Sequence, residues 1–123
     1  MAEPIVSVEH LRKEFDGTIA VADFSFAVHR GEIVGVLGAN GAGKTTTIQV
    51  LLGLTTPTSG TVRVFGQDLE RHRIEILQRT NFSSAYTGLP SNLKVWENLW
   101  VFAKVYGVKD HKAKSAQLLE MFE

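Results

Sequence analysis

The stretch Gly38-Ala39-Asn40-Gly41-Ala42-Gly43-Lys44-Thr45 decides the fold expected of this chain. It matches the pattern G-x-x-x-x-G-K-[S/T] at every fixed position. The apolar run before it, residues 33–37 at the end of the segment 32–37, predicts a buried strand, and the run after it, residues 46–52, predicts a helix that ends at Gly53. A strand, a glycine-rich loop and a helix in this order form an arrangement that binds nucleotide phosphates.

The residue types of this stretch explain the chemistry. Glycines let successive backbone N–H groups turn inward around an anion, and the start of the helix adds unpaired amides and a positive dipole end. Lys44 supplies a positive charge for the β- and γ-phosphates. The Thr45 hydroxyl suits Mg²⁺, which takes few protein ligands, and Thr46 suits the α-phosphate. The stretch therefore predicts a site for a nucleotide and Mg²⁺.

The composition places the chain among ordinary globular proteins. Of its 123 residues, 44% are hydrophobic and 21% are charged, which is enough for one modest core. The formal net charge is zero, which argues against a nucleic-acid-binding domain. The absence of cysteine excludes disulfides and thiolate metal sites and fits the cytosol. No apolar run approaches the ~18 residues that span a bilayer, and residues 1–4 do not form a signal peptide, so we expect any membrane contact to come through a partner.

Alternating and periodic apolar residues predict the remaining elements. We expect strands at residues 5–15, 19–28, 61–65 and 81–84, a turn at Asp16-Gly17, a loop at 85–92, and helices at 69–79, at 95–106 before Gly107, and after Asp110. The final helix carries an apolar stripe and no following element. This favours a chain cut short, and a naturally helical C-terminus is the alternative.

Several segments together resemble the nucleotide-binding domain of ABC transporters. They run in the family's order along nearly the whole chain: residues 11–15, 21–26, the loop with its flanks at 31–46, residues 57–62, and Leu93-Lys94-Val95-Trp96-Glu97-Asn98-Leu99, which is similar to the family's L-T-V-x-E-N-L. The resemblance is closest to ATPases of drug, antibiotic and polysaccharide exporters. It implies an α/β fold: part of a P-loop NTPase core with an antiparallel β subdomain and the start of a helical subdomain.

The resemblance also implies a binding site for ATP and Mg²⁺. Phe15 matches the position whose aromatic ring stacks on adenine; the alternative is a core residue of the hairpin. The loop amides from Gly41 to Thr45 would hold the β-phosphate, and Thr45 would be the metal ligand. The expected binding residues are Phe15, Gly38, Asn40, Gly41, Ala42, Gly43, Lys44, Thr45 and Thr46.

The sequence departs from the family pattern in two ways. Ala85 stands where the family places a glutamine that reaches the Mg²⁺ site and links hydrolysis to transport; Ser84 could lend a hydroxyl there. The L-S-G-G-Q signature, the acidic Walker B strand with its catalytic glutamate, and the switch histidine do not occur in the sequence. We therefore expect residues 1–123 to be the N-terminal portion of such a domain, with no catalytic residue. The histidines are expected to be ordinary surface or turn residues: His10, His29, His72 and His111.

The resemblance implies two partners, a transmembrane permease subunit and a second nucleotide-binding domain. Trp96 and Trp100 share a helix face, which favours either core packing or, with Tyr86 and Leu89, a groove for a cytoplasmic helix of the permease. The expected location is the cytoplasmic face of the membrane, with no nucleic-acid partner. Three alternatives remain open: a soluble ATPase of the same family, a non-catalytic truncated module, and a small phosphotransferase.

Overall fold

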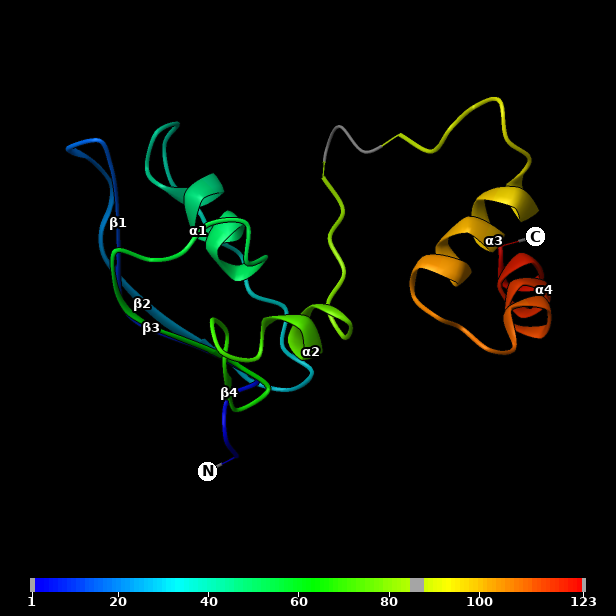
Figure 1. Cartoon of the computed structure of the whole chain (residues 1–123), viewed down its shortest axis with the longest axis horizontal. Helices are drawn as coiled ribbons and strands as arrows, with labels where there is room; N and C mark the ends of the chain where they lie inside the picture. The colour runs from blue at the N-terminus through cyan, green and yellow to red at the C-terminus, as the bar shows by residue number, and fades with distance from the viewer. Residues whose placement is uncertain (1, 85–87, 123) are drawn as a thin grey trace. The chain divides into compact units, whose positions relative to one another are not determined.

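The computed structural model describes residues 2–84 and 88–122, which fall into two units at residues 1–82 and 83–123. The first contains an antiparallel sheet and two helices, and the second contains a pair of helices (Figure 1). The antiparallel sheet and the separate helical unit agree with the predicted arrangement of a β subdomain followed by helices.

The sheet of the first unit has the strand order β2-β1-β3-β4 among the described residues. Its strands are β1 (Val6–Phe15), β2 (Thr18–Val28), β3 (Ser59–Val64) and the short β4 (Gln67–Asp68). Asp16 and Gly17 join β1 to β2 with φ angles of 45° and 82°. Two successive left-handed residues make the tight turn that suits the twist of a hairpin, so the turn predicted at Asp16-Gly17 is confirmed.

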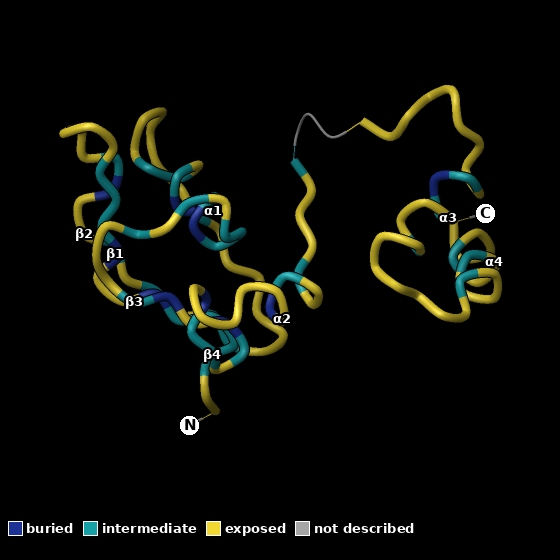
Figure 2. The backbone as a smooth tube through the Cα atoms, viewed as in Figure 1, coloured by how far each residue is buried: buried dark blue, intermediate teal, exposed yellow. Residues whose placement is uncertain are grey.

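A single hydrophobic core holds the first unit together. Its members come from the sheet, from helix α1 (Lys44–Leu51) and from the segment around helix α2 (Arg73–Leu77) (Figure 2). The buried core residues are Val8, Leu11, Val21, Val50, Val62, Val64, Leu69 and Ile76. Because Val50 of α1 belongs to this core together with residues of the sheet, the core anchors the helix that follows the glycine loop.

The strand predicted at residues 32–37 is wrong. These residues have no regular structure, and Ile33 and Leu37 are almost fully exposed. A strand needs hydrogen-bonding partners, and the strands of the described sheet pair with one another and not with this segment. The burial expected of this apolar run is wrong as well, since no described strand pairs with it or covers it.

Two further predictions in the first unit are wrong in part. Within 69–79 only Arg73–Leu77 is helical, because the Asp68 Oδ1 atom accepts the N–H groups of Glu70 and Arg71 and forms a turn instead. Residues 81–84 form no strand, since they too lack a pairing neighbour. The first helix starts at Lys44, two residues before the predicted residue 46. Gly53 ends it: the Gly53 N–H donates to Val50 O, and the Leu54 N–H donates to Gln49 O.

The second unit is a helical hairpin of α3 (Val95–Val105) and α4 (His111–Met121). Gly107 ends α3, as predicted. Its N–H donates to Lys104 O, and the N–H of Val108 donates to Ala103 O. Asp110 occupies the N-cap position of α4, but its side chain makes no capping bond. Asn98 is the buried residue of α3, whereas Trp96 and Trp100 are exposed. Core packing of the two tryptophans within the described residues is therefore wrong.

Candidate functional site

The glycine loop is fixed against β2 by Gly43, the N-cap residue of α1. Gly43 has φ 85°, a conformation that residues with a Cβ atom rarely adopt. A Cβ atom there would lie 2.6 Å from the Ala20 carbonyl oxygen and 2.8 Å from Val21 Cγ2. Glycine is therefore required both by the turn and by the close approach, and the start of α1 is held beside the strand.

The first turn of α1 offers backbone donors. In the part of the chain that the structure describes, the N–H groups of Lys44, Thr45 and Thr46 have no acceptor, because the first bond of the helix runs from Thr47 N–H to Gly43 O at 2.9 Å. The Ala42 N–H donates within the loop, to Ala39 O at 3.1 Å. The available donors at the helix start therefore come from three consecutive residues, and Ala42 shapes the loop in this conformation.

The Lys44 ammonium group lies across the loop. Its Nζ atom donates to Gly38 O and, at 2.7 Å, to Ala39 O. Lys44 is also one of the residues that line a hollow of about 450 Å³ beside the loop. The residues around this hollow are Ala20, Asn40, Gly41, Gly43, Lys44, Thr45 and Thr46. A cation and unpaired N–H groups in one hollow suit an anion with several oxygens, such as a phosphate chain.

Three consecutive threonines follow the lysine in sequence and differ in what surrounds their side chains. Thr45 and Thr46 line the hollow. Thr47 is 2% exposed, and its Oγ1 atom donates to Gly43 O at 2.9 Å. Thr47 therefore fastens the helix to the loop, while the Thr45 hydroxyl has no hydrogen-bond partner within residues 2–84 and 88–122 and is free to take a metal ion.

Phe15 lies at the end of β1, outside the hydrophobic core. Its side chain is 43% exposed, and the Lys13 Nζ atom is 4.7 Å from its ring centroid. Phe15 pairs with Thr18 of β2, two residues before Ala20, which lines the hollow. The alternative that Phe15 is a core residue of the hairpin is wrong, and the ring presents surface at the turn end of β1 and β2.

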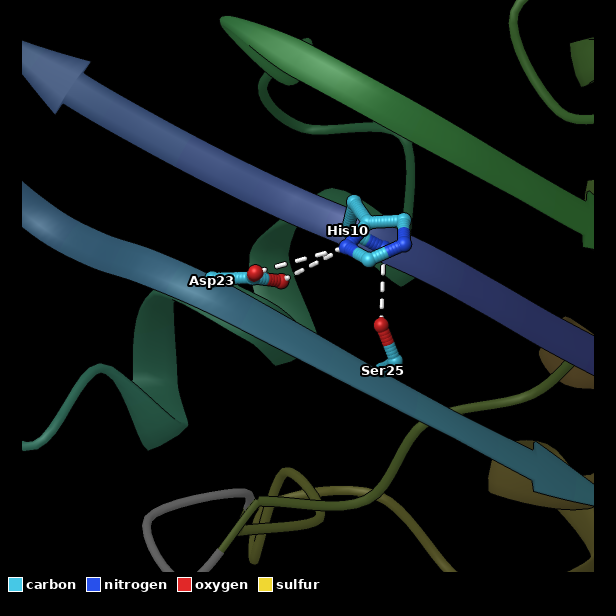
Figure 3. Close-up of polar contacts among 3 residues, drawn as sticks. All are labelled: His10, Asp23 and Ser25. Carbon is cyan, nitrogen blue, oxygen red and sulfur yellow. Dashed lines mark hydrogen bonds and ion pairs between the residues drawn. The ribbon is translucent and has the colours of Figure 1, made fainter.

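A serine, a histidine and an aspartate also meet on the sheet, but they do not form a nucleophilic site (Figure 3). The His10 Nδ1 atom lies 3.2 Å from Asp23 Oδ1, while Ser25 Oγ accepts a bond from the His10 backbone N–H at 2.8 Å and does not contact the ring. His29 and His72 make similar side-chain contacts on the surface, with Glu32 and Glu75. These three histidines are surface residues, as predicted.

The predicted partner groove belongs to the second unit. Leu89 is exposed and Trp96 is 56% exposed. Tyr86 and Ala85 lie outside the described residues. The turn before α3 is ordered by Asn98, whose Nδ2 atom donates to Lys94 O at 3.2 Å and to Leu93 O at 3.4 Å.

Sequence reasoning missed three residues that shape the site. Ala20 contacts the loop through its backbone, and no side-chain pattern marks such a contact. Lys13 and Phe15 are two residues apart on a predicted strand, and this spacing indicates that their side chains share a face and can touch. Thr47 lies one helical turn after Gly43, but the sequence does not show that its side chain is buried and bonded to Gly43 O.

Comparison with known proteins agrees with this geometry. The sequence pattern of the ABC transporter family matches residues 21–123. The Nod factor export ATP-binding protein I of Ralstonia nicotianae is 40% identical over 105 residues, which are 85% of this chain and 33% of that protein. The Bacitracin transport ATP-binding protein BcrA of Bacillus licheniformis is 39% identical over 109 residues, which are 89% of this chain and 36% of that protein.

A solved structure gives the same result for the fold. A structure described as that of the ATP binding subunit of an ABC transporter superposes with a TM-score of 0.76 and 29% identity, covering 86% of this chain and 44% of that one. The predicted α/β fold, part of a P-loop NTPase core with an antiparallel β subdomain, is confirmed. The chain spans about a third of the length of these curated relatives. It belongs to the ABC transporter family.

Proposed function

We propose that this chain binds MgATP as the nucleotide-binding portion of a transporter ATPase subunit. The observation that carries the proposal is the hollow in which the Lys44 ammonium and the N–H groups at the start of α1 come together. Charged donors and a helix start favour an anion far more than a neutral ligand. Two of the relatives are named as ATP-binding proteins of export or transport, which supports the same assignment.

Each loop residue has a role in this proposal. Lys44 exchanges its two neutral carbonyl acceptors for oxygens of the β- and γ-phosphates, because an ammonium group binds an anionic oxygen more strongly than a neutral carbonyl oxygen. The amides of Gly41, Gly43, Lys44 and Thr45 hold the β-phosphate, joined by the amide of Ala42 once it leaves Ala39 O, with Gly38 and Asn40 shaping the loop. Thr46 binds the α-phosphate, Thr45 binds Mg²⁺, and Phe15 stacks on the base. When bound, ATP supplies the phosphoanhydride whose hydrolysis the transporter uses.

The activity of the whole protein extends this proposal. Residues 1–123 form the first portion of a nucleotide-binding domain, and hydrolysis takes place in a dimer of complete domains. The transporter exports its substrate, and the subunit lies on the cytoplasmic face of the membrane, bound to a transmembrane permease through Leu89 and Trp96, with Tyr86. Exposed apolar side chains on and before α3 support a protein contact there. None of the described helices has the length and apolar character needed to cross a bilayer.

A reciprocal pair of variants tests the two parts of the proposal. Lys44→Ala removes the phosphate-binding charge and is expected to weaken MgATP binding by about 10-fold or more, from the 1.5–3 kcal/mol typical of hydrogen bonds to charged groups. Leu89→Glu places a charge in the partner groove and should abolish binding to the detergent-solubilised permease. Each variant should leave the other's ligand unaffected, as measured by calorimetry for ATP and by co-purification for the permease.

Lys109→Ala is the matched control, since it removes a lysine of the second unit. Its MgATP affinity should equal that of the unchanged chain. An unchanged affinity in Lys44→Ala contradicts the phosphate site. Loss of both ligands, or of neither, in Leu89→Glu contradicts the groove.

A further inference from the structure

A lysine covers one face of the proposed adenine platform. Lys13 and Phe15 are two residues apart on β1, so their side chains leave the same face of the sheet. The Lys13 Nζ atom lies 4.7 Å from the centroid of the Phe15 ring. This is within the range of roughly 6 Å over which a cation is attracted by an aromatic face.

The ring is the principal partner of this charge. Among the described residues, no carboxylate lies within ion-pair distance of Lys13; the adjacent Glu14 is paired with Arg12 at 3.1 Å. A cation without a counter-ion that rests on an aromatic ring limits the positions that the ring adopts. It also occupies one of the two ring faces on which a flat ligand could stack.

We infer that Lys13 is a positioning residue for the nucleobase. It holds the Phe15 ring from one face, so that the base stacks on the other face and the order becomes ammonium, phenyl ring, purine. The inference rests on the proposed function, because it assumes that a nucleotide occupies the loop. It goes further in assigning Lys13 to the base and not to the phosphates.

The molecule contains a matched control for this contact. The Arg79 guanidinium lies 3.9 Å from the centroid of the Phe65 ring, which is another cation on a phenyl face. The Phe65 N–H donates to Ile5 O, next to the first residue of β1, whereas Phe15 is the last residue of that strand. Removing the Arg79 cation therefore tests a cation–ring contact of the same kind at the other end of the strand.

The experiment compares a probe with a base and a probe without one. MgATP and magnesium tripolyphosphate are titrated into the unchanged chain and into Lys13→Met, Lys13→Arg and Arg79→Met. Lys13→Met should weaken MgATP binding by about two- to fivefold, as expected from an exposed cation–ring contact, and leave tripolyphosphate binding unchanged. Lys13→Arg, which keeps the cation, should restore MgATP affinity, and Arg79→Met should bind both probes normally. In a Phe15→Leu background, Lys13→Met should have no further effect.

Other outcomes overturn the inference in distinguishable ways. Equal weakening of both probes in Lys13→Met means that the lysine acts as a general charge for phosphates. An unchanged MgATP affinity means that it has no role in binding. In both cases the proposed function stands. If the unchanged chain binds neither probe, the proposed function fails and the inference fails with it. Lys13→Gln replaces the methionine variant if circular dichroism shows that the latter is unfolded.

Discussion

The two units of this chain differ in what holds them together. The first has a core of eight buried apolar residues drawn from strands and helices far apart in sequence. In the second, the described residues bury Asn98 but no apolar side chain, and Trp96, Trp100 and Phe102 are exposed. The first unit can therefore hold its glycine loop in place by its own packing. The apolar residues of the second are available to another surface.

The difference separates two kinds of function. Binding a phosphate chain needs donors fixed in advance, and Gly43 and Thr47 fix them against β2 and α1. Contact with a partner needs exposed apolar surface, which α3 provides. We therefore expect nucleotide binding to depend on the first unit and partner binding on the second.

The largest effect that tests this contrast is on stability. Leu11 is 0% exposed in the first core, whereas Leu119 of α4 is exposed. Leu11→Ala should lower the free energy of unfolding by about 2–5 kcal/mol, the range for buried leucines. Leu119→Ala should change it by about 0.5 kcal/mol or less. Urea unfolding followed by circular dichroism measures both.

The two tryptophans give this experiment an internal control. Both lie in α3, so their fluorescence reports the second unit alone. Leu11→Ala should leave the fluorescence transition in place while it shifts the circular dichroism transition. Equal costs for the two leucine variants would remove the distinction between the units.

The next effect concerns the fit of the loop against β2. Gly43→Ala combines a strained positive φ with contact to the Ala20 carbonyl, and we expect a loss of MgATP affinity equivalent to about 3 kcal/mol. Gly41 has a similar φ of 84°, but a Cβ atom there meets nothing within 4 Å. Gly41→Ala should therefore cost only the strain, about 1–2 kcal/mol. Calorimetric titration measures both variants, and equal losses would mean that packing against β2 does not matter.

The smallest effect is a pH dependence in the turn after β2. The Glu32 carboxylate accepts the His29 N–H at 2.6 Å, and this bond is the main cause that lowers the pKa of Glu32. Because the pKa is lowered in the folded state, the carboxylate stabilises that state at pH values above the ordinary carboxyl pKa. This contribution is lost as the pH falls below about 4.

Glu32→Gln tests this pH dependence. The unchanged chain should melt slightly above the variant at neutral pH, and thermal melts should show the gap closing in acid. A gap that stays constant with pH would assign the effect to something other than this carboxylate.

Features that depend on local chemistry could be predicted from the sequence. The glycine loop, the Asp16-Gly17 turn and the glycines that end α1 and α3 each depend on a few neighbouring residues, and the structure contains all of them. For Phe15 the sequence left a stacking residue and a core residue as alternatives, and the structure places the ring outside the core.

Features that depend on distant partners could not be predicted. The apolar run at 32–37 suggested a strand, but no described strand pairs with it. The closeness of Gly43 to the Ala20 backbone depends on how α1 packs on β2, which no periodicity records. The exposure of Trp96 and Trp100 likewise depends on which elements cover α3, and the apolar character of the helix could not decide this.

Amide hydrogen exchange with and without MgATP tests the central claim most directly, because it locates the ligand in one experiment. We expect new protection at residues 38–47 and around Phe15, and none in α3 or α4. Protection that appears in Val95–Val105 or His111–Met121 while residues 38–47 remain unchanged would contradict the assignment of nucleotide binding to the first unit.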